Sequence, residues 1–332
     1  MPRSARRITI SQVAEAAGVD RSTVSRAFTR PDLIRAETTR HVLAVAERLG
    51  YAPNRTARAL STGRTANLAL VVHDLTNPFI PALILGVQAE AERHDYCVFI
   101  GNSDEIPAQE ARLVRRFAAQ VDGIILVSSR ASDAAVAEMA AVAPLVLVNR
   151  ETAGISRVLI DASKGMRHAI AHLVDLGHRR IAYIGGPESS WSNAGRRRAV
   201  TEAAGLHGVE LVSIPAGRAS FEAGRAVVGK VRDSGVTAAI AFDDVLAQGL
   251  LSGLAEARIT VPAGFSLIGC DDVLGAVTHP ALTSISNRAD EAGRAAVRIL
   301  MQRLSGEAML SEVVLETDLV LRETTAPPTR GC

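Results

Sequence analysis

The sequence predicts an α/β protein in which a small N-terminal helix-turn-helix head precedes a core of two doubly wound parallel-sheet lobes. The chain has 332 residues, which at about 150 residues per domain corresponds to roughly two domains. Before residue 64 the chain contains only short helical patterns. From residue 67 onward, continuous apolar runs alternate with helical patterns of about 10–16 residues, as buried parallel strands and their connecting helices do.

Composition excludes several classes of protein. Hydrophobic residues make up 48% of the chain and charged residues 22%, the values of an ordinary folded protein. No apolar run approaches the ~18 residues of a membrane span, and no apolar segment follows the basic N-terminus, so we expect neither a membrane protein nor a secreted one. The three cysteines, Cys97, Cys270 and Cys332, lie far apart, which disfavours a disulfide scaffold or a zinc finger and indicates the cytoplasm.

The net charge of +2 is distributed unevenly along the chain. Residues 1–64 contain 12 Arg, no Lys and five acidic residues, for a net charge of +7, whereas the remainder carries −5. A basic head on an acidic body indicates that the head alone binds a polyanion. The alternative is that a short domain varies in charge by chance.

The head begins with two short helices joined by a tight turn. Thr9 and Gln12 form a Thr-x-x-Gln capping box at the start of the first helix, and Gly18 ends it. Asp20 can cap the second helix, which we place at Arg21–Phe28. The outer face of this second helix then carries Arg21, Ser22, Ser25 and Arg26.

A third helix and a short hinge complete the head region. The third helix runs from about Glu37 to Leu49, with apolar residues at helical spacing. Residues 53–64 then read as a helix of about seven residues that Pro53 and Asn54 open and Gly63 closes. Because isolated helices below ~12 residues are marginal in water, this hinge helix must fold against something.

The body contains ten apolar strand candidates. Each is a continuous run rather than an alternating one, as expected of strands buried on both faces. They are Asn67–His73, Tyr96–Gly101, Gly123–Val127, Pro144–Val148, Val158–Ile160, Arg180–Ile184, Leu211–Ile214, Ala238–Phe242, Phe265–Cys270 and Leu282–Ile285.

Polar and turn residues follow most of these strands. The segments are Asn77–Phe79, Asn102-Ser103, Ser128-Ser129, Asn149-Arg150, the 185–196 loop, Asp243-Asp244 and Asp271-Asp272. Ligands of open parallel sheets bind outside the carboxyl ends of the strands, so two lobes that face each other across such edges form a cleft. There Arg196 can donate to a polyol, and Asp271, Asp243 and Asn149 can accept from it. The alternative is that these are ordinary turn residues.

Signals for catalysis or metal binding are weak. The chain contains no GxSxG, HExxH, GxxxxGK[ST] or GxGxxG motif, so we expect no enzyme and no cofactor. His168 and His172 share a helix face but lack an acidic partner motif, so we expect surface residues and no metal site. An α/β enzyme that uses the paired aspartates for acid–base work remains an alternative.

The motifs along the whole chain are those of a known family. The head contains Thr-Val-Ser-Arg at Thr23–Arg26 and Gly-Tyr-Ala-Pro-Asn at Gly50–Asn54. The body adds, in order, Thr62–Thr65, Asn77–Phe79, Leu176–Ile181, Gly185–Pro187, Ile268–Asp272, His279-Pro280 and Leu321–Thr325. Over about residues 8–325 the chain therefore resembles the lac repressor/galactose repressor (LacI/GalR) family of bacterial transcription regulators.

The resemblance implies an architecture. It implies a DNA-binding head at residues 1–52, a hinge at 53–64, a core at 65–325 like that of periplasmic sugar-binding proteins, and a tail at 326–332. Within the core it implies an N-lobe of about 65–160 and 288–315 and a C-lobe of about 161–287 and 316–325, with crossings near 161, 288 and 316. It also implies a homodimer on a pseudo-palindromic double-stranded operator, and the absence of leucine heptads in the tail disfavours a tetramer.

The resemblance also implies the residues of two sites. For DNA they are Thr9, Arg21, Ser22, Thr23, Ser25, Arg26, Asn54, Arg55, Ala57 and Leu60, with Leu60 as a minor-groove wedge. For a small-molecule effector they are Phe79, Ser128, Asn149, Ser190, Trp191, Ser192, Arg196, Phe221, Asp243 and Asp271. Two positions depart from the family pattern: Asp243 stands where many members have Asn, and either Ala219 or Phe221 occupies the place of an aromatic wall.

The function expected from this resemblance is sequence-specific transcriptional regulation. We expect a repressor whose operator affinity is controlled by a sugar or sugar derivative bound between the lobes. A transport-type sugar-binding protein without a DNA function is the alternative, which the basic head and the lack of a secretory signal disfavour. The sequence identifies neither the effector nor whether it induces or co-represses.

Overall fold

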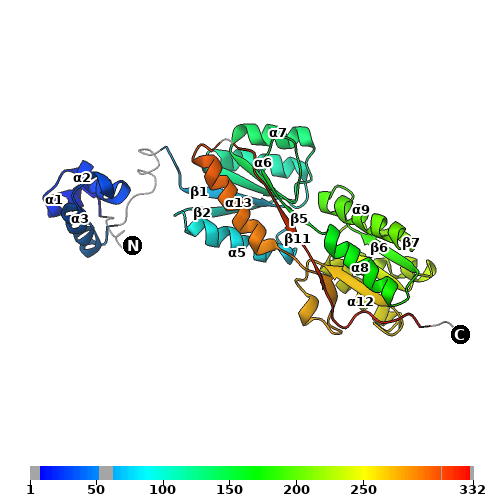
Figure 1. Cartoon of the computed structure of the whole chain (residues 1–332). Helices are drawn as coiled ribbons and strands as arrows, with labels where there is room; N and C mark the ends of the chain where they lie inside the picture. The colour runs from blue at the N-terminus through cyan, green and yellow to red at the C-terminus, as the bar shows by residue number, and fades with distance from the viewer. Residues whose placement is uncertain (1–7, 52–62, 308, 330–332) are drawn as a thin grey trace, which may run out of the picture. The chain divides into compact units, whose positions relative to one another are not determined.

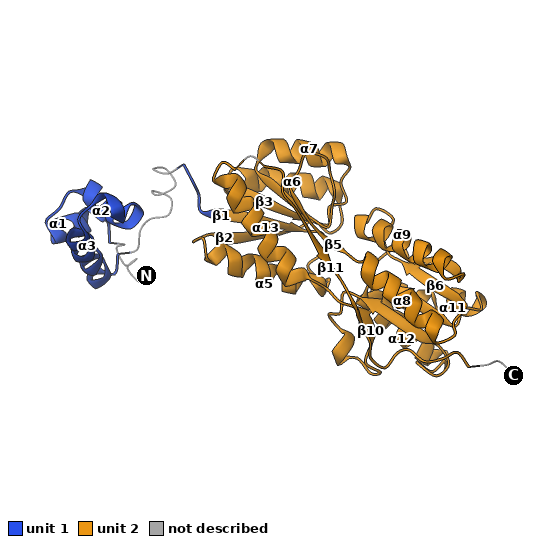
Figure 2. Cartoon of the chain, in the orientation of Figure 1, with its two compact units in different colours: residues 1–66 blue, residues 67–332 orange. Residues whose placement is uncertain are grey.

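The computed structural model describes residues 8–51, 63–307 and 309–329. The chain divides into two compact units, residues 1–66 and residues 67–332 (Figure 2). Within the described ranges no helix has the length and apolar character needed to cross a membrane.

Over residues 8–51 the first unit contains three α-helices around a small apolar core (Figure 1). They are α1 (Ile10–Ala17), α2 (Arg21–Thr29) and α3 (Ala36–Leu49), with a short 3-10 turn at Pro31–Leu33. Their buried residues are Val13, Ala14, Ala17, Val24, Ala27, Val42, Val45 and Ala46. The predicted helix-turn-helix and its third, supporting helix are confirmed.

The helix ends are set by local hydrogen bonds. The backbone N–H of Thr9 donates to Oε1 of Gln12 at 2.9 Å, as the predicted capping box requires. Gly18 ends α1 at φ 65°, in the left-handed region that favours glycine. Asp20 occupies the N-cap position of α2, as predicted, although its carboxylate makes no capping hydrogen bond.

The expected hinge helix cannot be compared with the structure. Residues 52–62 lie outside the described residues, and they include Asn54, Arg55, Ala57 and Leu60. The hinge and the minor-groove wedge therefore stay predictions.

The N-lobe of the second unit is a six-stranded parallel sheet in the order β11-β5-β4-β3-β1-β2. Its strands are β1 (Asn67–Val72), β2 (Cys97–Asn102), β3 (Gly123–Val127), β4 (Leu145–Val148), β5 (Arg157–Asp161) and β11 (Glu312–Glu316). Leu68 of β1 pairs with Val98 on one side and with Gly123 on the other. The central strands are buried along almost their whole length, which explains why their sequences are continuously apolar.

Helices cover both faces of this sheet (Figure 1). On one face α5 (Phe79–Glu92) packs beside α13 (Ala289–Leu304), although about 200 residues separate them in sequence. On the other face lie α6 (Pro107–Ala118) and α7 (Asp133–Val142).

The C-lobe repeats the same plan in the order β12-β10-β9-β8-β6-β7. Its strands are β6 (Arg180–Gly185), β7 (Glu210–Pro215), β8 (Ala238–Ala241), β9 (Ser266–Cys270), β10 (Thr283–Ile285) and the antiparallel β12 (Leu319–Val320). One face packs against α8 (Ser163–Asp175) and α9 (Trp191–Leu206). The other packs against α10 (Phe221–Ala226), α11 (Val228–Asp233) and α12 (Asp244–Glu256), and a 3-10 turn lies at Gly275–Val277.

The chain passes between the lobes after β5, after β10 and after β11 (Figure 1). The strands β11 and β12, next to the last of these crossings, are not among those predicted from sequence. Both lie at sheet edges, and Leu315 is the one buried residue of β11, so neither has the continuous apolar pattern of a central strand.

The strand order determines where a ligand can bind. In each sheet the order reverses beside the first strand, between β1 and β3 in the N-lobe and between β6 and β8 in the C-lobe. Such switch points form a crevice at the carboxyl ends of the strands. The predicted α/β class with two doubly wound lobes is therefore confirmed, and it positions two crevices in one unit.

The contact between α5 and α13 yields a stability prediction. A Cβ added at Gly293 of α13 would lie 2.5 Å from the backbone oxygen of Leu83 and 2.9 Å from the nitrogen of Val87, both in α5. Gly293→Ala must therefore push these helices apart and should cost about 1–3 kcal/mol of unfolding free energy. Gly205→Ala, in exposed α9 backbone with no neighbour within 4 Å, should instead stabilise by about 0.5–1 kcal/mol. Urea unfolding of both variants checks this, and equal effects would contradict the close packing.

Candidate functional site

A cavity of about 510 Å³ lies between the two lobes of the second unit. Its walls come from the segments that follow the carboxyl ends of β1 to β4 in the N-lobe and of β6 to β9 in the C-lobe. This volume falls within the ~300–1,000 Å³ typical of small-molecule sites. The residues that line it are His73, Asp74, Thr76, Asn77, Phe79, Asn102, Asp104, Glu105, Ser128, Arg130, Asn149, Ser190, Ser192, Arg196, Arg218, Ala219, Ser220, Phe221, Glu222, Phe242, Val245 and Asp271.

Three lining residues share an unusual backbone conformation directly after a strand. Ser128 follows β3 at φ 49°, Asn149 follows β4 at φ 52°, and Asp271 follows β9 at φ 91°. Non-glycine residues adopt this left-handed region at an energetic cost, and such residues concentrate at ligand sites. The bend turns each polar side chain away from its sheet, and the surrounding strands hold it there.

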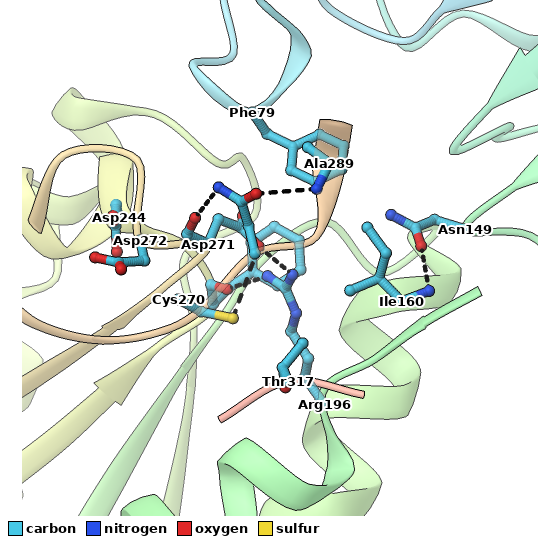
Figure 3. A network of polar contacts seen from close by, with 12 residues as sticks. Phe79, Asn149, Ile160, Arg196, Asp244, Cys270, Asp271, Asp272, Ala289 and Thr317 are labelled. Carbon is cyan, nitrogen blue, oxygen red and sulfur yellow. Dashed lines mark hydrogen bonds and ion pairs between the residues drawn. The ribbon is translucent and has the colours of Figure 1, made fainter. Parts of the chain in front are cut away.

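An ion pair between Arg196 and Asp271 lies at the base of the cavity (Figure 3). Nη2 of Arg196 donates to Oδ1 of Asp271 at 2.5 Å, and both residues are buried. Nη1 of Arg196 donates to the backbone oxygen of Phe242, and the guanidinium lies 4.8 Å from the centre of the Phe242 ring. These contacts compensate the burial of two charges and fix the guanidinium plane beside the cavity.

The N-lobe wall carries a second ion pair. Nη2 of Arg130 donates to Oε1 of Glu105 at 2.6 Å. The loop that holds Arg130 is tied down by buried Glu110, which accepts from the Ser129 hydroxyl at 2.5 Å and from the Arg130 backbone N–H at 2.8 Å. Burial raises the pKa of Glu110, although these hydrogen bonds oppose the shift.

Asn149 and His73 present polar atoms from the N-lobe. The amide oxygen of Asn149 accepts from the backbone N–H of Ile160 at 3.0 Å, so its amide nitrogen is the group that can donate into the cavity (Figure 3). His73 follows β1 and is buried, and its Nδ1 has no hydrogen-bond partner among the described residues. Burial, with a smaller contribution from Arg130, lowers the pKa of His73 to about 4, so its imidazole is neutral at pH 7.

Eight of the ten residues expected to bind an effector line this cavity. They are Phe79, Ser128, Asn149, Ser190, Ser192, Arg196, Phe221 and Asp271. Ala219 and Phe221, the two alternatives for the aromatic wall, both line it. Ser190 also caps α9 by accepting from the backbone N–H of Asn193 at 3.2 Å.

Trp191 does not line this cavity, which corrects its expected place. Ser192 and Arg196 are four residues apart on α9 and share the helix face that points to the cavity. Trp191, Gly195 and Arg198 line an adjoining cavity of about 260 Å³ beside the first interlobe crossing, and Ser192 and Arg196 line both cavities.

Asp243 also lies off the cavity wall, because its side chain turns back onto its own helix. Its Oδ1 accepts from the backbone N–H of Leu246 at 2.8 Å and so caps α12, while Oδ2 is buried without a hydrogen-bond partner among the described residues. Burial and, to a smaller extent, the charge of Asp271 raise the pKa of Asp243 to about 7, against the opposing effects of Leu246 and Arg196. The neighbouring Asp244, whose pKa burial raises to about 6, holds the loop after β9 through Val273 and Leu274.

The lining residues that sequence reasoning missed come mostly from loops just after strands. They include His73, Asp74, Glu105, Arg130, Arg218 and Glu222. His73 is the last residue of a predicted strand, so its place at a strand end could have identified it as a residue that lines the cleft. Arg218 lies between β7 and α10, and Glu222 lies in the first turn of α10; in this segment only Ala219 and Phe221 were expected to line the cleft.

The predicted DNA-contacting residues of the head lie at the start of α1 and along α2. Arg21, Ser22 and Arg26 are exposed, Thr23 and Ser25 are half-buried, and Thr9 is exposed at the N-cap of α1. The exposed side chains of the α2 face are opposite the buried Val24 and Ala27. They form a polar, basic surface on the second helix of a helix-turn-helix.

Protonation of Asp243 yields a prediction about stability. The unfolded chain loses this proton near the usual Asp pKa of about 3.9, whereas the native state retains it to about pH 7. The native state therefore binds more protons between these values, and the free energy of unfolding should fall as the pH rises through this range.

The variant Asp243→Asn tests this directly, because Asn also caps helices well. Its unfolding free energy should decline less between about pH 4 and 7, with Asp244 responsible for a residual slope. Unfolding curves at a series of pH values check this against Asp233→Asn, at an exposed position, which should parallel the wild type. Superimposable pH profiles for Asp243→Asn and the wild type would contradict the shifted pKa.

Two family models match this chain. Residues 9–54 match the model of bacterial regulatory proteins of the lacI family, and residues 170–325 match that of a periplasmic binding protein-like domain. The first match covers the three helices of the head, and the second covers most of the C-lobe together with α13 and β11.

Relatives of known role align with nearly the whole chain. Catabolite control protein A of Priestia megaterium is 31% identical over 319 residues, which cover 92% of this chain and 96% of that protein. The HTH-type transcriptional repressor CytR of Escherichia coli is 30% identical over 327 residues, which cover 96% of each chain.

Solved structures have the same fold. The lac repressor dimer bound to operator and the anti-inducer ONPF matches with a TM-score of 0.87 and 25% identity, over 97% of this chain and 100% of that one. The complex of the transcriptional regulator CelR with cellobiose matches with a TM-score of 0.72 and 30% identity, over 96% of this chain and 100% of that one. Because relatives at 30% identity or more extend over the head and both lobes, this chain belongs to the lacI family of bacterial transcriptional regulators.

Proposed function

We propose that this chain is a transcriptional repressor that binds a pseudo-palindromic operator as a homodimer, and that a sugar or sugar derivative controls its operator affinity. The observation that carries the proposal is the cleft: a single cavity lined by strand ends of both lobes, in a chain whose other unit is a helix-turn-helix. Both parts align together with repressors over almost their full length.

The DNA contact is assigned to the exposed face of α2. In a helix-turn-helix the second helix lies in the major groove, and its N-terminal residues reach base edges. Arg21 and Ser22 open α2 and are exposed, and Arg26 follows one turn later. Arginine pairs in bidentate fashion with O6 and N7 of guanine, so Arg21 is our candidate for base recognition.

The effector is assigned to the cleft because a ligand there touches both lobes. A ligand shifts a conformational equilibrium only through its different affinity for the two states, and a change in the angle between lobes alters contacts that span them. The hydroxyl, amide, carboxylate and guanidinium groups of the lining suit a polyhydroxylated ligand. The complex of CelR with cellobiose supports a sugar.

A homodimer is supported by the lac repressor structure and by the N-lobe sheet edge. The outer strand of that sheet, β2, exposes Phe99 at 37% and Ile100 at 38% of their surface. An unpaired edge strand with large apolar side chains is an unfavourable surface in water unless another chain covers it.

A transport-type sugar-binding protein without a DNA role is the second candidate, because residues 170–325 match a periplasmic binding protein-like domain. A transport role would leave the helix-turn-helix, and the net charge of +7 on residues 1–64, without a function, so we favour the repressor. The relatives are regulators rather than enzymes, and we propose no reaction for the cleft. A DNA target places the proposed activity in the cytoplasm.

The role of Arg21 can be tested on DNA selected from a random library by the wild-type protein. Arg21→Ala should relax preference at one symmetric base pair per half-site, with a loss of about 1–3 kcal/mol of discrimination there. Binding of single-base operator variants measures this, and Arg48→Ala, an exposed residue at the end of α3, is the control. A uniform loss of affinity on all sequences would make Arg21 a phosphate contact instead.

The role of Arg196 can be tested with sugars. Arg196→Ala should abolish effector binding and the effector's influence on operator affinity, while operator binding by the ligand-free protein persists. Because the change leaves Asp271 buried without its partner, Arg196→Lys is tested beside it: it retains a cation but loses the planar fork.

Calorimetry with the sugar that binds the wild type measures the loss, and Arg197→Ala, exposed on the same helix, is the control. If both Arg196 variants bind this sugar with wild-type affinity, the effector site lies elsewhere.

A further inference from the structure

The charges that line the cleft do not balance. Five carboxylates line it, from Asp74, Asp104, Glu105, Glu222 and Asp271, against three guanidinium groups, from Arg130, Arg196 and Arg218. When all are ionised the lining has a net charge of −2. A cleft of one sign concentrates ligands of the opposite sign and repels ligands of its own.

Two of the three cations are already paired. Arg130 forms its ion pair with Glu105 at 2.6 Å, and Arg196 forms its pair with Asp271 at 2.5 Å. The paired carboxylates offset the positive charge of both guanidinium groups, so an anionic ligand gains little net attraction from either. Among the described lining residues, Arg218 is the remaining guanidinium, and it is exposed. The remaining carboxylates are those of Asp74, Asp104 and Glu222.

His73 does not offset the imbalance. A protonated imidazole would add a positive charge to the N-lobe wall, but burial keeps this one neutral at pH 7. Its Nδ1 is buried and has no partner among the described residues, which is costly unless a ligand completes the site. A neutral imidazole can supply one donor and one acceptor to a hydroxyl group, and no charge to a phosphate.

We propose that the cleft selects an uncharged or positively charged polyol, such as a free sugar or an amino sugar, and discriminates against sugar phosphates and sugar acids. This inference rests on the proposed function and narrows its ligand class. Hydroxyl groups donate to the unpaired carboxylates on both lobes, while the Asn149 amide and the Arg196 fork donate to ring oxygens. An amino group gains further from the net negative charge, whereas a phosphate is repelled by it.

The test compares matched sets of ligands on the wild-type protein. Each set contains a free sugar, its amino derivative, its phosphate and its acid: glucose, glucosamine, glucose 6-phosphate and gluconate, with cellobiose and ribose sets alongside. Thermal shift identifies the sets that bind, and calorimetry at low salt measures each member.

We expect the phosphate and the acid to bind at least tenfold more weakly than the free sugar of the same set. Because Asp104 and Glu222 are exposed to solvent, the difference should shrink as salt is raised. The amino derivative should bind at least as tightly as the free sugar.

Variants of the lining carboxylates distinguish an effect of the cleft's charge on ligand selection from an effect of its shape. Replacing two unpaired lining carboxylates in Asp104→Asn/Glu222→Gln should reduce the discrimination against the phosphate, measured as the ratio of its affinity to that of the free sugar in the same variant, about threefold or more. Glu138→Gln, an exposed position on α7 outside the cavity, removes a charge of the same sign and should leave the ratio unchanged.

The possible failures are distinguishable. A phosphate or acid that binds as tightly as its free sugar overturns the charge selection while leaving a sugar-responsive repressor intact. A ratio unaffected by salt and by the double variant overturns it as well. If no member of any set binds, the sugar effector itself is wrong, and this inference fails with it.

Discussion

The buried ion pair between Arg196 and Asp271 is the interaction on which the ligand cleft depends. It joins α9 to the end of β9 across 75 residues of sequence, and it places two buried charged groups beside the cavity. Removal of either partner leaves the other as an uncompensated buried charge, which costs several kcal/mol in typical proteins. The arrangement persists because the backbone oxygen and ring of Phe242 stabilise the guanidinium, and because β9 holds Asp271 in its left-handed conformation.

Asp243 and Asp244 add two further carboxylates close enough to interact electrostatically with Asp271, and Figure 3 shows Asp244 among them. One cation therefore faces several potential anions in a buried environment, and the resulting repulsion and desolvation raise the pKa of Asp243. Many members of the family have an amide at this position. A protonated carboxyl group resembles that amide because it presents both an acceptor and a donor, so at neutral pH the substitution preserves the hydrogen-bonding character of the position.

The sequence was most informative where local physics determines the structure. The ten predicted strands are present, and those at the centre of each sheet are buried, whereas the edge strands β2 and β7 are partly exposed. The helix-turn-helix follows from cap residues and from Gly18 at a left-handed position. The strands β11 and β12 were missed because edge strands need not be apolar. In the site, the polar residues at strand ends were predicted well. Trp191 was assigned to the wrong cavity, because its position in the sequence does not show which cavity its side chain lines. Arg218 precedes α10 and Glu222 lies in its first turn, and no local sequence pattern indicates that these two side chains line the cavity.

The three crossings between the lobes have a consequence for synthesis on the ribosome. The C-lobe is formed mostly by one continuous stretch between β5 and β10, whereas the N-lobe needs α13 and β11, which come after it. The ribosome therefore synthesises the first five strands of the N-lobe long before α13, the helix that covers one face of their sheet. That face stays exposed until residue 304, the end of α13, has emerged. Although domains usually mature in the order of translation, here the lobe that begins first must be completed last. The interval exposes the apolar surface of α5, β3, β4 and β5 that α13 later covers, so the rate of elongation through the C-lobe sets how long chaperones and neighbouring chains can reach it.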